Sequence, residues 1–183
     1  MVIALLVTSY LTREALETAA KDKLAVVLEA RESALRHWAD EQKEDLTIMA
    51  FAPGTIMFLR DLSTEFHKLG DNAQILLQQN YLASERDYKT ASPQLAIAAY
   101  DKAHRLATPF FSRRYNTYGW EDIFLIDTQG NVVYSLLKET DFATNLRTGP
   151  WRDSGLARAV MPLLQDAIPG QISFSDFSLY APS

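Results

Sequence analysis

The residues best suited to chemistry in this sequence lie in one short run towards its end. Between Lys138 and Arg147, a lone Phe142 is surrounded by polar and charged side chains. These side chains are Lys138, Glu139, Thr140, Asp141, Thr144, Asn145 and Arg147. Such a composition is typical of a solvated loop. It also combines hydrogen-bond donors and acceptors of the kind that bind a small polar molecule.

Two neighbouring features favour a binding wall. The run follows directly after a predicted core strand, and it ends at Gly149-Pro150-Trp151, just before an amphipathic helix predicted over 154–164 with Ser154 at its start. A polar segment that passes between a sheet and a helix is a common place for a small-molecule pocket. Residues 138–152 are called the polar crossing below.

A β-hairpin is predicted immediately before the polar crossing. Two apolar runs, 122–127 and 132–137, are rich in β-branched and aromatic residues and are separated by turn formers. Gly130 is expected to take the positive φ of a bulged hairpin loop, and the Asp127 carboxylate to accept hydrogen bonds from backbone amides two residues on. Adjacent apolar positions in the first run predict a central strand that is covered on both faces.

The motifs from Gly119 to Ser183 together resemble one known family. They are Gly119-Trp120-Glu121-Asp122-Ile123-Phe124-Leu125-Ile126-Asp127, Gly130-Asn131-Val132-Val133-Tyr134, Lys138-Glu139-Thr140-Asp141-Phe142-Ala143-Thr144-Asn145-Leu146, Gly149-Pro150-Trp151, Ser154-Gly155-Leu156, Phe174-Ser175-Asp176-Phe177 and Tyr180-Ala181-Pro182-Ser183. This order resembles the extracytoplasmic sensory region of bacterial methyl-accepting chemotaxis proteins and related transmembrane receptors. The polar crossing is its most specific part, and the helical remainder is similar only in pattern.

The resemblance implies a PAS-like sensor domain of the Cache type, with a ligand pocket between the sheet and the polar crossing. The candidate ligand-binding residues are Trp120 and Tyr134 as aromatic walls, Lys138, Arg147 and Arg152 as cationic donors, Asp141 and Asp176 as acceptors, Thr144 and Asn145 as neutral groups, and Trp151. Trp151 is expected to pack over the loop. A structural role fits Asp141, Asn145 and Asp176 individually slightly better, since Asp176 would also suit a helix cap or a partner for Lys138. The Arg-x-Trp-Tyr motif of amino-acid-binding Cache sensors is absent, which argues against an α-amino-acid ligand.

A third strand is predicted over 171–179. Ile172, Phe174 and Asp176 would share one face of it, so that an inward carboxylate follows two core residues. Because a PAS-like sheet has five antiparallel strands and three are found, residues 118–183 are expected to form a partial sensor domain. The third strand would then carry an unpaired edge.

The chain before the hairpin is predicted to be helical. Residues 12–52 contain no proline or glycine, so they predict one rod of about 60 Å, at 1.5 Å per residue. One face of this rod carries a stripe of residues that are spaced alternately four and three positions apart. They are Leu24, Leu28, Arg31, Leu35, Trp38, Gln42, Asp45 and Met49. Its partner is either a later helix of the same chain or the rod of a second subunit, and the resemblance favours a homodimer. The polar members of the stripe argue against a strict coiled coil.

Shorter helices are predicted over 55–69, 73–84 and 92–114. The last would open with Ser92-Pro93 as its cap and would be kinked or divided near Leu106 by Pro109. Residues 115–119 are expected to be a hinge. The predicted fold class is therefore α+β, with a long N-terminal helix and a helical bundle over 12–117, followed by an incomplete PAS-like Cache antiparallel sheet.

Residues 1–11 are apolar but supply only about half of the roughly 20 residues that span a membrane. They fit the buried start of a soluble helix, an interfacial anchor, or the end of a transmembrane helix. The resemblance favours the last, and with it a receptor anchored in the bacterial inner membrane whose sensor lies on the periplasmic side.

Composition and motifs argue against several other classes of protein. The net charge of −5 and the lack of a basic cluster argue against nucleic-acid binding. There is no cysteine, and the three histidines lack metal-ligand spacing, so no metal or cofactor site is predicted. Catalytic motifs are also absent, which predicts a protein that is not an enzyme.

The expected function is therefore ligand sensing by a transmembrane chemoreceptor. The domain would bind a small polar molecule and signal through movement of its helices. Three alternatives remain. The same sensor could serve a transmembrane nucleotide cyclase or histidine kinase, the chain could be a soluble helical interaction module without a ligand, or it could be a hydrolase with two catalytic side chains in one cleft.

Overall fold

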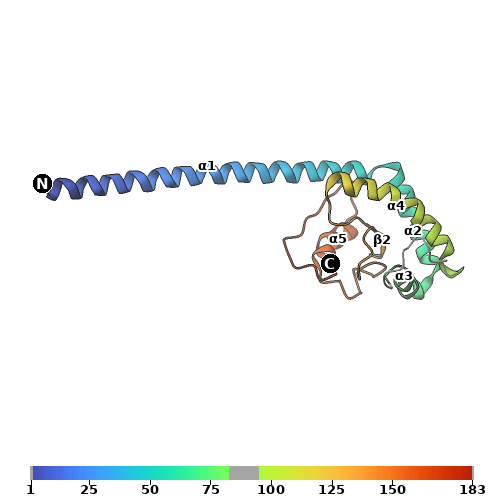
Figure 1. Ribbon diagram of the computed structural model, residues 1–183. Coiled ribbons are helices and arrows are strands. Elements are labelled where there is room, and N and C mark those ends of the chain that lie inside the picture. The colour runs from blue at the N-terminus through green and yellow to red at the C-terminus, as the bar shows by residue number, and fades with distance from the viewer. Residues whose placement is uncertain (1, 83–94, 183) are drawn as a thin grey trace. The chain divides into compact units, whose positions relative to one another are not determined.

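The computed structural model describes the backbone of residues 2–82 and 95–182, and the side chains of residues 13–82 and 96–182. The chain divides into two compact units, one up to Leu46 and one from Thr47 onward. The described part is mostly helical, with a long N-terminal helix and a small antiparallel sheet. This arrangement confirms the predicted α+β class (Figure 1).

The first unit consists of the long helix α1, Val2–Ala50, whose last residues belong to the second unit. At 1.5 Å per residue its 49 residues measure roughly 74 Å. Ion pairs one turn apart, such as Arg13 with Glu17 at 3.1 Å and Glu32 with Arg36 at 2.6 Å, lie along its solvated surface. The predicted continuous rod is confirmed, and it ends two residues earlier than expected.

Residues 2–11 continue the same helix, but their side chains lie outside the described part. In the described part of the chain, no helix combines the length and the apolar character that crossing a membrane requires. The transmembrane interpretation of residues 1–11 stays a prediction.

The second unit begins with α2, Pro53–Lys68, whose Pro53 stands in the first turn, where its missing N–H costs nothing. A 3-10 turn, η1 (Gly70–Asn72), leads into α3, Ala73–Tyr81. A second 3-10 turn, η2 (Leu95–Ile97), leads into α4, Ala98–Tyr118. Helices α2 and α3 agree with the predicted ones to within three residues. Helix α4 begins at Ala98 and ends at Tyr118, later at both ends than the predicted 92–114, and the expected Ser92-Pro93 cap lies outside the described residues.

Two predictions about α4 are wrong. A kink or a division near Leu106 was expected, and the helix is not divided: it continues through Pro109. Buried Ala107 and Phe111 stand on either side of the proline, so packing holds both halves in one helix. The expected hinge over 115–119 is also helical up to Tyr118, and Gly119 ends the helix with a φ of 68°.

The core of the second unit lies between α2, α4 and the sheet. Helices α2 and α4 lie side by side, and α2 contacts β2 (Figure 1). Helix α4 meets β2 through the rings of Phe111 and Tyr134, whose centroids are 5.2 Å apart. The aromatic rings of Phe58, Phe110 and Phe111 meet edge to face, with centroids 5.0 to 6.1 Å apart. Leu62 and Phe111 are fully buried. This core forms the support on which the hairpin and the polar crossing rest.

The hairpin consists of β1, Phe124–Ile126, and β2, Val132–Ser135, paired antiparallel with a bulge between Leu125 and Ile126. Gly130 has a φ of 87°, and the Gln129 amide donates to Asp127 Oδ1 at 2.9 Å. The predicted hairpin, its bulge and both turn roles are confirmed. The predicted central position of the first strand is wrong, because β1 pairs with β2 alone among the described strands. All four residues of β2 are buried.

The predicted third strand over 171–179 is wrong. That segment forms no strand, and Phe174, Phe177 and Leu179 are exposed. An alternating pattern becomes a strand only if a neighbour completes its hydrogen bonds. The outer edge of β2 is already taken by the polar crossing, because the Val132 amide donates to Thr144 O at 2.9 Å and the Ala143 amide donates to Val132 O at 3.1 Å. The expected unpaired edge of a third strand therefore has no counterpart among the described residues.

The last helix is α5, Gly155–Gln165, and the predicted Ser154 cap is confirmed. Its hydroxyl accepts from the Ala157 amide at 3.1 Å. A Cβ at Gly155 would lie 2.8 Å from Ser178 Oγ, so the C-terminal segment passes closely over the start of this helix. This passage brings Tyr180 towards the polar crossing.

Candidate functional site

The middle of the polar crossing, residues 141–146, is mostly buried in the second unit. Asp141, Phe142, Thr144 and Leu146 are almost fully buried. From α3, Gln78 Nε2 donates to the carbonyls of Thr140 and Phe142 at 3.1 and 2.7 Å. The crossing is therefore fixed to a helix on one side and to β2 on the other.

Lys138, the first residue of the crossing, directs its ammonium group inward. Its φ of 60° is in the left-handed region, which a lysine adopts only where the surroundings impose it. Nζ lies over three aromatic rings, at 4.2 Å from the Tyr134 centroid, 4.6 Å from Phe142 and 5.9 Å from Tyr81. It also donates to the Ser135 carbonyl. The lysine thus occupies an aromatic cage.

Burial lowers the pKa of Lys138 to about 7, although the nearby Asp122 and Asp141 carboxylates act in the opposite direction. An ammonium group loses hydration when it is moved among aromatic rings, and the rings replace only part of it. Near neutral pH the side chain is thus balanced between a charged and a neutral form. A lysine in water would be fully charged at that pH.

The carboxylates of Asp122 and Asp141 interact electrostatically with Lys138, and one oxygen of each carboxylate accepts no hydrogen bond from the described residues. Asp122 Oδ1 accepts from the amides of Ile123, Leu136 and Leu137 at 2.6 to 3.1 Å. Asp141 Oδ2 accepts from the Tyr180 hydroxyl. The second oxygen of each group is buried and has no hydrogen-bond partner among the described residues. Burial raises the pKa of both carboxyl groups.

His104 forms the helical side of the site. Its ring lies 4.6 Å from the Tyr81 ring and 5.4 Å from the Tyr134 ring. Burial lowers its pKa, and the positive charges of Lys138 and Arg105 lower it further, so the imidazole is neutral. Its Nε2 is buried and lacks a hydrogen-bond partner in the described structure.

The tyrosines around this cluster are fixed by hydrogen bonds. Tyr81 donates to Asp101 Oδ1 at 2.9 Å, and Tyr100 donates to the Val133 carbonyl at 2.7 Å. Burial raises the pKa of Tyr134 to about 12, so this phenol stays protonated. The aromatic walls are thus held in place before any ligand arrives.

The Lys138 site is defined here as Tyr81, His104, Asp122, Tyr134, Lys138, Asp141, Phe142 and Tyr180. Its spare donors are on the lysine and its spare acceptors are on the two aspartates. No ion pair within 4 Å joins Lys138 to either aspartate among the ion pairs of the described residues. A small molecule that both accepts and donates hydrogen bonds would satisfy both sets.

Three of the predicted candidates, Tyr134, Lys138 and Asp141, lie together in this site. Three others have structural contacts beside it. Thr144 Oγ1 donates to the Asp141 carbonyl at 2.6 Å, Asn145 Nδ2 donates to Gln129 O at 3.0 Å, and Trp151 Nε1 donates to Thr140 O at 3.2 Å. Trp151 therefore packs over the crossing, as expected.

The remaining candidates lie outside the Lys138 site. Trp120 stacks on Tyr118 at 4.7 Å, and Arg152 is exposed with its Nε 3.6 Å from Asp153. Asp176 is exposed and accepts from the Phe177 amide at 2.8 Å. Its expected inward orientation is wrong because the strand that would have turned it inward does not form. Arg147 is exposed and covers Gly130.

Tyr81, His104, Asp122 and Tyr180 were not among the candidates. Tyr180 belongs to the Tyr-Ala-Pro-Ser motif, and that polar aromatic could have been proposed as a ligand contact. Tyr100, His104 and Phe111 recur at helical spacing, which indicates a helix face with a polar ring among apolar ones. Nothing local to Tyr81 marks it, because its role depends on how α3 packs.

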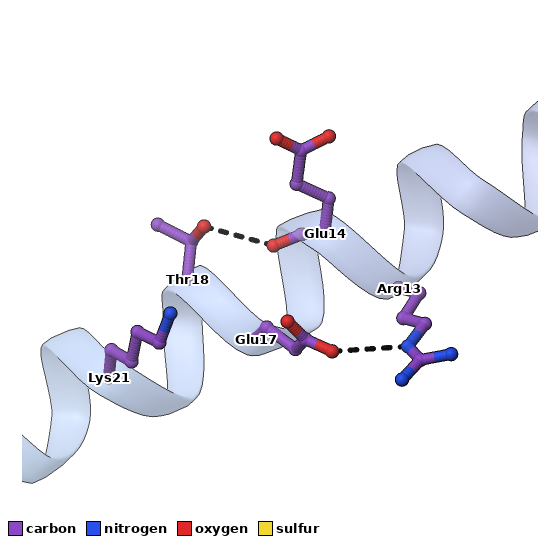
Figure 2. Close-up of a pocket in the computed structure, with 5 residues that line it drawn as sticks. All are labelled: Arg13, Glu14, Glu17, Thr18 and Lys21. Carbon is purple, nitrogen blue, oxygen red and sulfur yellow. Dashed lines mark hydrogen bonds and ion pairs between the residues drawn. The ribbon is translucent and has the colours of Figure 1, made fainter.

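A hollow on α1 and a metal site are two further candidates for binding, and neither is supported among the described residues. A hollow on α1 is lined by Arg13, Glu14, Glu17, Thr18 and Lys21 (Figure 2). All five residues come from one solvated helix face, and Thr18 and Arg13 already bond within that face, so no second wall encloses a ligand. No three His, Asp or Glu side chains of the described residues are grouped to hold a metal ion.

Comparisons with protein families, with the curated proteins and with the solved structures found no match.

Proposed function

We propose that residues 47–183 belong to an extracytoplasmic sensor domain that binds a small polar molecule at the Lys138 site. The domain would serve a bacterial transmembrane chemoreceptor of the methyl-accepting type, on the periplasmic side of the inner membrane, without catalysing a reaction. The observation that carries the proposal is the presence, in one site, of an inward ammonium and two buried carboxylate oxygens, on Asp122 and Asp141, that have no hydrogen-bond partner among the described residues.

Buried polar groups that lack hydrogen-bond partners lower the stability of a core that has only a structural role. A buried polar atom without a partner costs about 1–3 kcal/mol, and an apolar replacement of buried charges is often neutral or stabilising. Strongly shifted titratable groups that cluster together are characteristic of functional sites. A ligand that accepts from Lys138 and donates to the two aspartates would compensate this cost.

The site also has a direct connection to the helices. Tyr100 and Thr108 of α4 bond to Val133 and Tyr134 of β2, at 2.7 and 3.4 Å. Gln78 of α3 bonds to the crossing. A ligand that prefers one arrangement of these contacts would change the position of α3 and α4, which is the form of signal expected from such a receptor.

A thermal-shift screen of the full chain tests the binding claim. The panel contains organic acids, amines and sugars, and a compound at 100 times its Kd should add about 2.7 kcal/mol to the free energy of unfolding. We expect compounds that carry both a donor and an acceptor to raise Tm. If no compound of the panel raises Tm, the chain is better explained as a helical interaction module without a ligand.

The partner of α1 is proposed to be the same helix of a second subunit. Leu24, Leu28, Leu35 and Trp38 lie on its predicted stripe and are between 55% and 69% exposed. Apolar side chains at this spacing bury their surface well when two helices pair. The proposal gives the receptor a dimer through which helix movement passes. The same sensor on a nucleotide cyclase or a histidine kinase would use an equivalent dimer.

Sedimentation equilibrium of the full chain tests this dimer. Leu28→Glu should shift the mass from two chains towards one, because it places a charge in the paired stripe. Ala30→Glu is the matched control, since Ala30 is exposed on the opposite side of the helix, and it should leave the mass unchanged. A monomeric parent protein, or equal effects of both changes, would contradict the proposal.

A further inference from the structure

A second hollow lies along the polar crossing, and no residue of the Lys138 site lines it. It is a cleft of about 480 Å³ between the end of α2, the start of α3, the hairpin loop and the crossing. Asp141 and Phe142 belong to the Lys138 site, while the following Ala143 and Asn145 line the cleft. Its volume is within the range of small-molecule sites.

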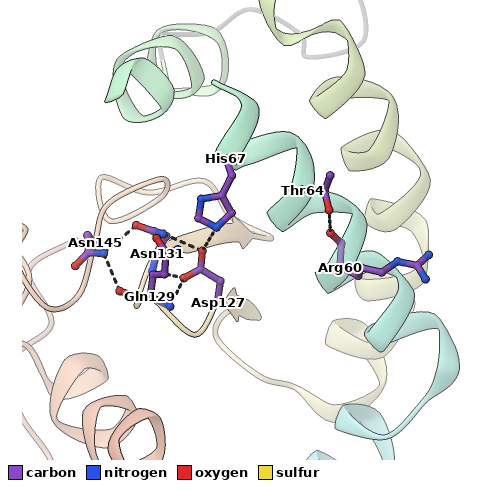
Figure 3. A network of polar contacts seen from close by, with 7 residues as sticks. All are labelled: Arg60, Thr64, His67, Asp127, Gln129, Asn131 and Asn145. Atoms are coloured by element: carbon purple, nitrogen blue, oxygen red, sulfur yellow. Dashed lines mark hydrogen bonds and ion pairs between the residues drawn. The ribbon is translucent and has the colours of Figure 1, made fainter. Parts of the chain in front are cut away.

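A network of polar contacts stabilises one wall of the cleft (Figure 3). Buried Asp127 accepts from the Gln129 and Asn131 amides at 2.9 Å, and from Asn131 Nδ2 at 2.8 Å. His67 reaches from α2 and places Nε2 at 3.0 Å from Asp127 Oδ2. Both carboxylate oxygens are thus occupied, and the helix is joined to the hairpin loop.

Asn145 joins the polar crossing to the same hairpin loop. Its Nδ2 donates to Gln129 O and to Asn131 Oδ1 at 3.0 and 2.8 Å, and its Oδ1 accepts from the Arg147 and Thr148 amides at 2.8 and 3.1 Å. Figure 3 shows the loop residues converging between Asn145 and His67. The cleft therefore has rigid walls before any ligand binds, which lowers the entropic cost of binding.

The groups that line the cleft are mostly neutral and polar. Gln74, Gln129 and Thr148 carry amides and a hydroxyl, and Phe66, Ala73 and Ala143 supply apolar surface. The lining contains no lysine or arginine, so an anion would find no countercharge there. Exposed Asp71 is the one carboxylate of the lining, and an exposed carboxylate attracts a cation only weakly.

We propose that this cleft binds an uncharged polyhydroxy molecule, such as a monosaccharide or a polyol. Carboxamide and hydroxyl side chains both donate and accept, as sugar hydroxyls do. The apolar patches match the C–H surfaces of such a ligand. The site is additional to the Lys138 site, and the two share the polar crossing as a common wall.

Calorimetric titration of the full chain tests the cleft. The probes are glucose, galactose, mannose, sorbitol and myo-inositol, with gluconate and glucosamine as charged analogues. Gln129→Trp fills the cleft from an exposed position, and Thr128→Trp adds the same bulk at the neighbouring exposed residue that does not line it. We expect a neutral probe to bind, Gln129→Trp to weaken it at least tenfold, and Thr128→Trp to leave it unchanged.

Two further variants separate this proposal from the proposed function. Gln129→Ala, which removes a hydrogen-bonding group without adding bulk, should weaken the same probe in a protein with unchanged Tm. Lys138→Met should leave cleft binding intact. If no neutral probe binds, if only the charged analogues bind, or if both tryptophan variants behave alike, the cleft proposal is overturned. If Lys138→Met abolishes binding instead, the sugar occupies the Lys138 site, and only the cleft proposal fails.

Discussion

The Lys138→Met variant is expected to be more stable than the parent protein and to lose ligand binding. Methionine has a similar length and can fill the cage of Tyr81, Tyr134 and Phe142 with apolar atoms. Replacing buried ionic groups by apolar groups of similar volume is often neutral or stabilising by about 1–4 kcal/mol, whereas breaking a buried ion pair is destabilising. Lys138 makes no ion pair within 4 Å among the described residues, so we expect the first outcome. Urea unfolding at pH 7 measures the change.

The pH dependence of the free energy of unfolding shows whether the buried ammonium of Lys138 causes this difference in stability. The folded pKa of Lys138 is about 7 and its ordinary value is 10.5, so between these values the unfolded chain binds more protons than the folded one. The free energy of unfolding of the parent protein should therefore rise as the pH increases from 7 towards 10.5, and this contribution should be missing in Lys138→Met. The difference in the free energy of unfolding between Lys138→Met and the parent protein should thus become smaller at high pH.

Lys102→Met serves as the control for this comparison, because Lys102 is an exposed lysine of α4. It should change the free energy of unfolding by less than about 0.5 kcal/mol, with the parent's pH dependence retained. A Lys138→Met protein that is less stable than the parent at every pH would show that the ammonium holds the fold together. In that case the lysine has a structural role.

Phe142→Ala is expected to have the largest destabilising effect, about 3–5 kcal/mol in the free energy of unfolding. Phe142 is fully buried, and its ring meets Tyr81 edge to face at 5.7 Å. Removing the ring leaves a cavity between α3 and the crossing and opens one side of the Lys138 cage. Chemical denaturation of the full chain, followed by tryptophan fluorescence, gives the value.

Leu137→Ala is the matched control for Phe142→Ala. Leu137 is also a large apolar residue of the same segment, but it is 47% exposed, so its truncation should cost under about 1 kcal/mol. If Phe142→Ala costs no more than Leu137→Ala, the crossing behaves as a solvated loop. The Lys138 site would then lose its wall.

Local features of the fold were predictable because their causes lie within a few residues. Gly130 and Asp127 determine the hairpin loop through a positive φ and a nearby amide, and Ser154 caps the helix that follows it. The long helix follows from a run without proline or glycine. In each case the sequence neighbours supply the hydrogen bonds that decide the conformation.

The third strand and the position of Asp176 were not predictable in this way. Their residues alternate correctly, yet β2 bonds to the polar crossing instead, and that choice depends on contacts across the chain. Likewise Pro109 should divide α4 by local rules, but buried Ala107 and Phe111 keep it in one piece. Tertiary packing overrides local preference in both places.

The candidate site was predicted in part. Lys138 and Asp141 were chosen because a polar run after a strand suggests a binding wall, but the same composition fits a solvated loop. What distinguishes the two is the burial of Phe142 and the approach of Tyr81, His104 and Tyr180 from distant parts of the chain. These contacts have no signature within the run itself.

The most direct measurement of the central claim is a calorimetric titration of the parent protein and Lys138→Met with one organic acid or amine that raises the parent's Tm, because neutral sugars and polyols are expected in the separate cleft. The compound should carry both a hydrogen-bond donor and an acceptor. Lys138→Met should be folded and more stable at pH 7, yet bind that compound at least tenfold more weakly than the parent. Equal affinity in the two proteins would contradict the assignment of Lys138 as the recognition group of a sensor domain.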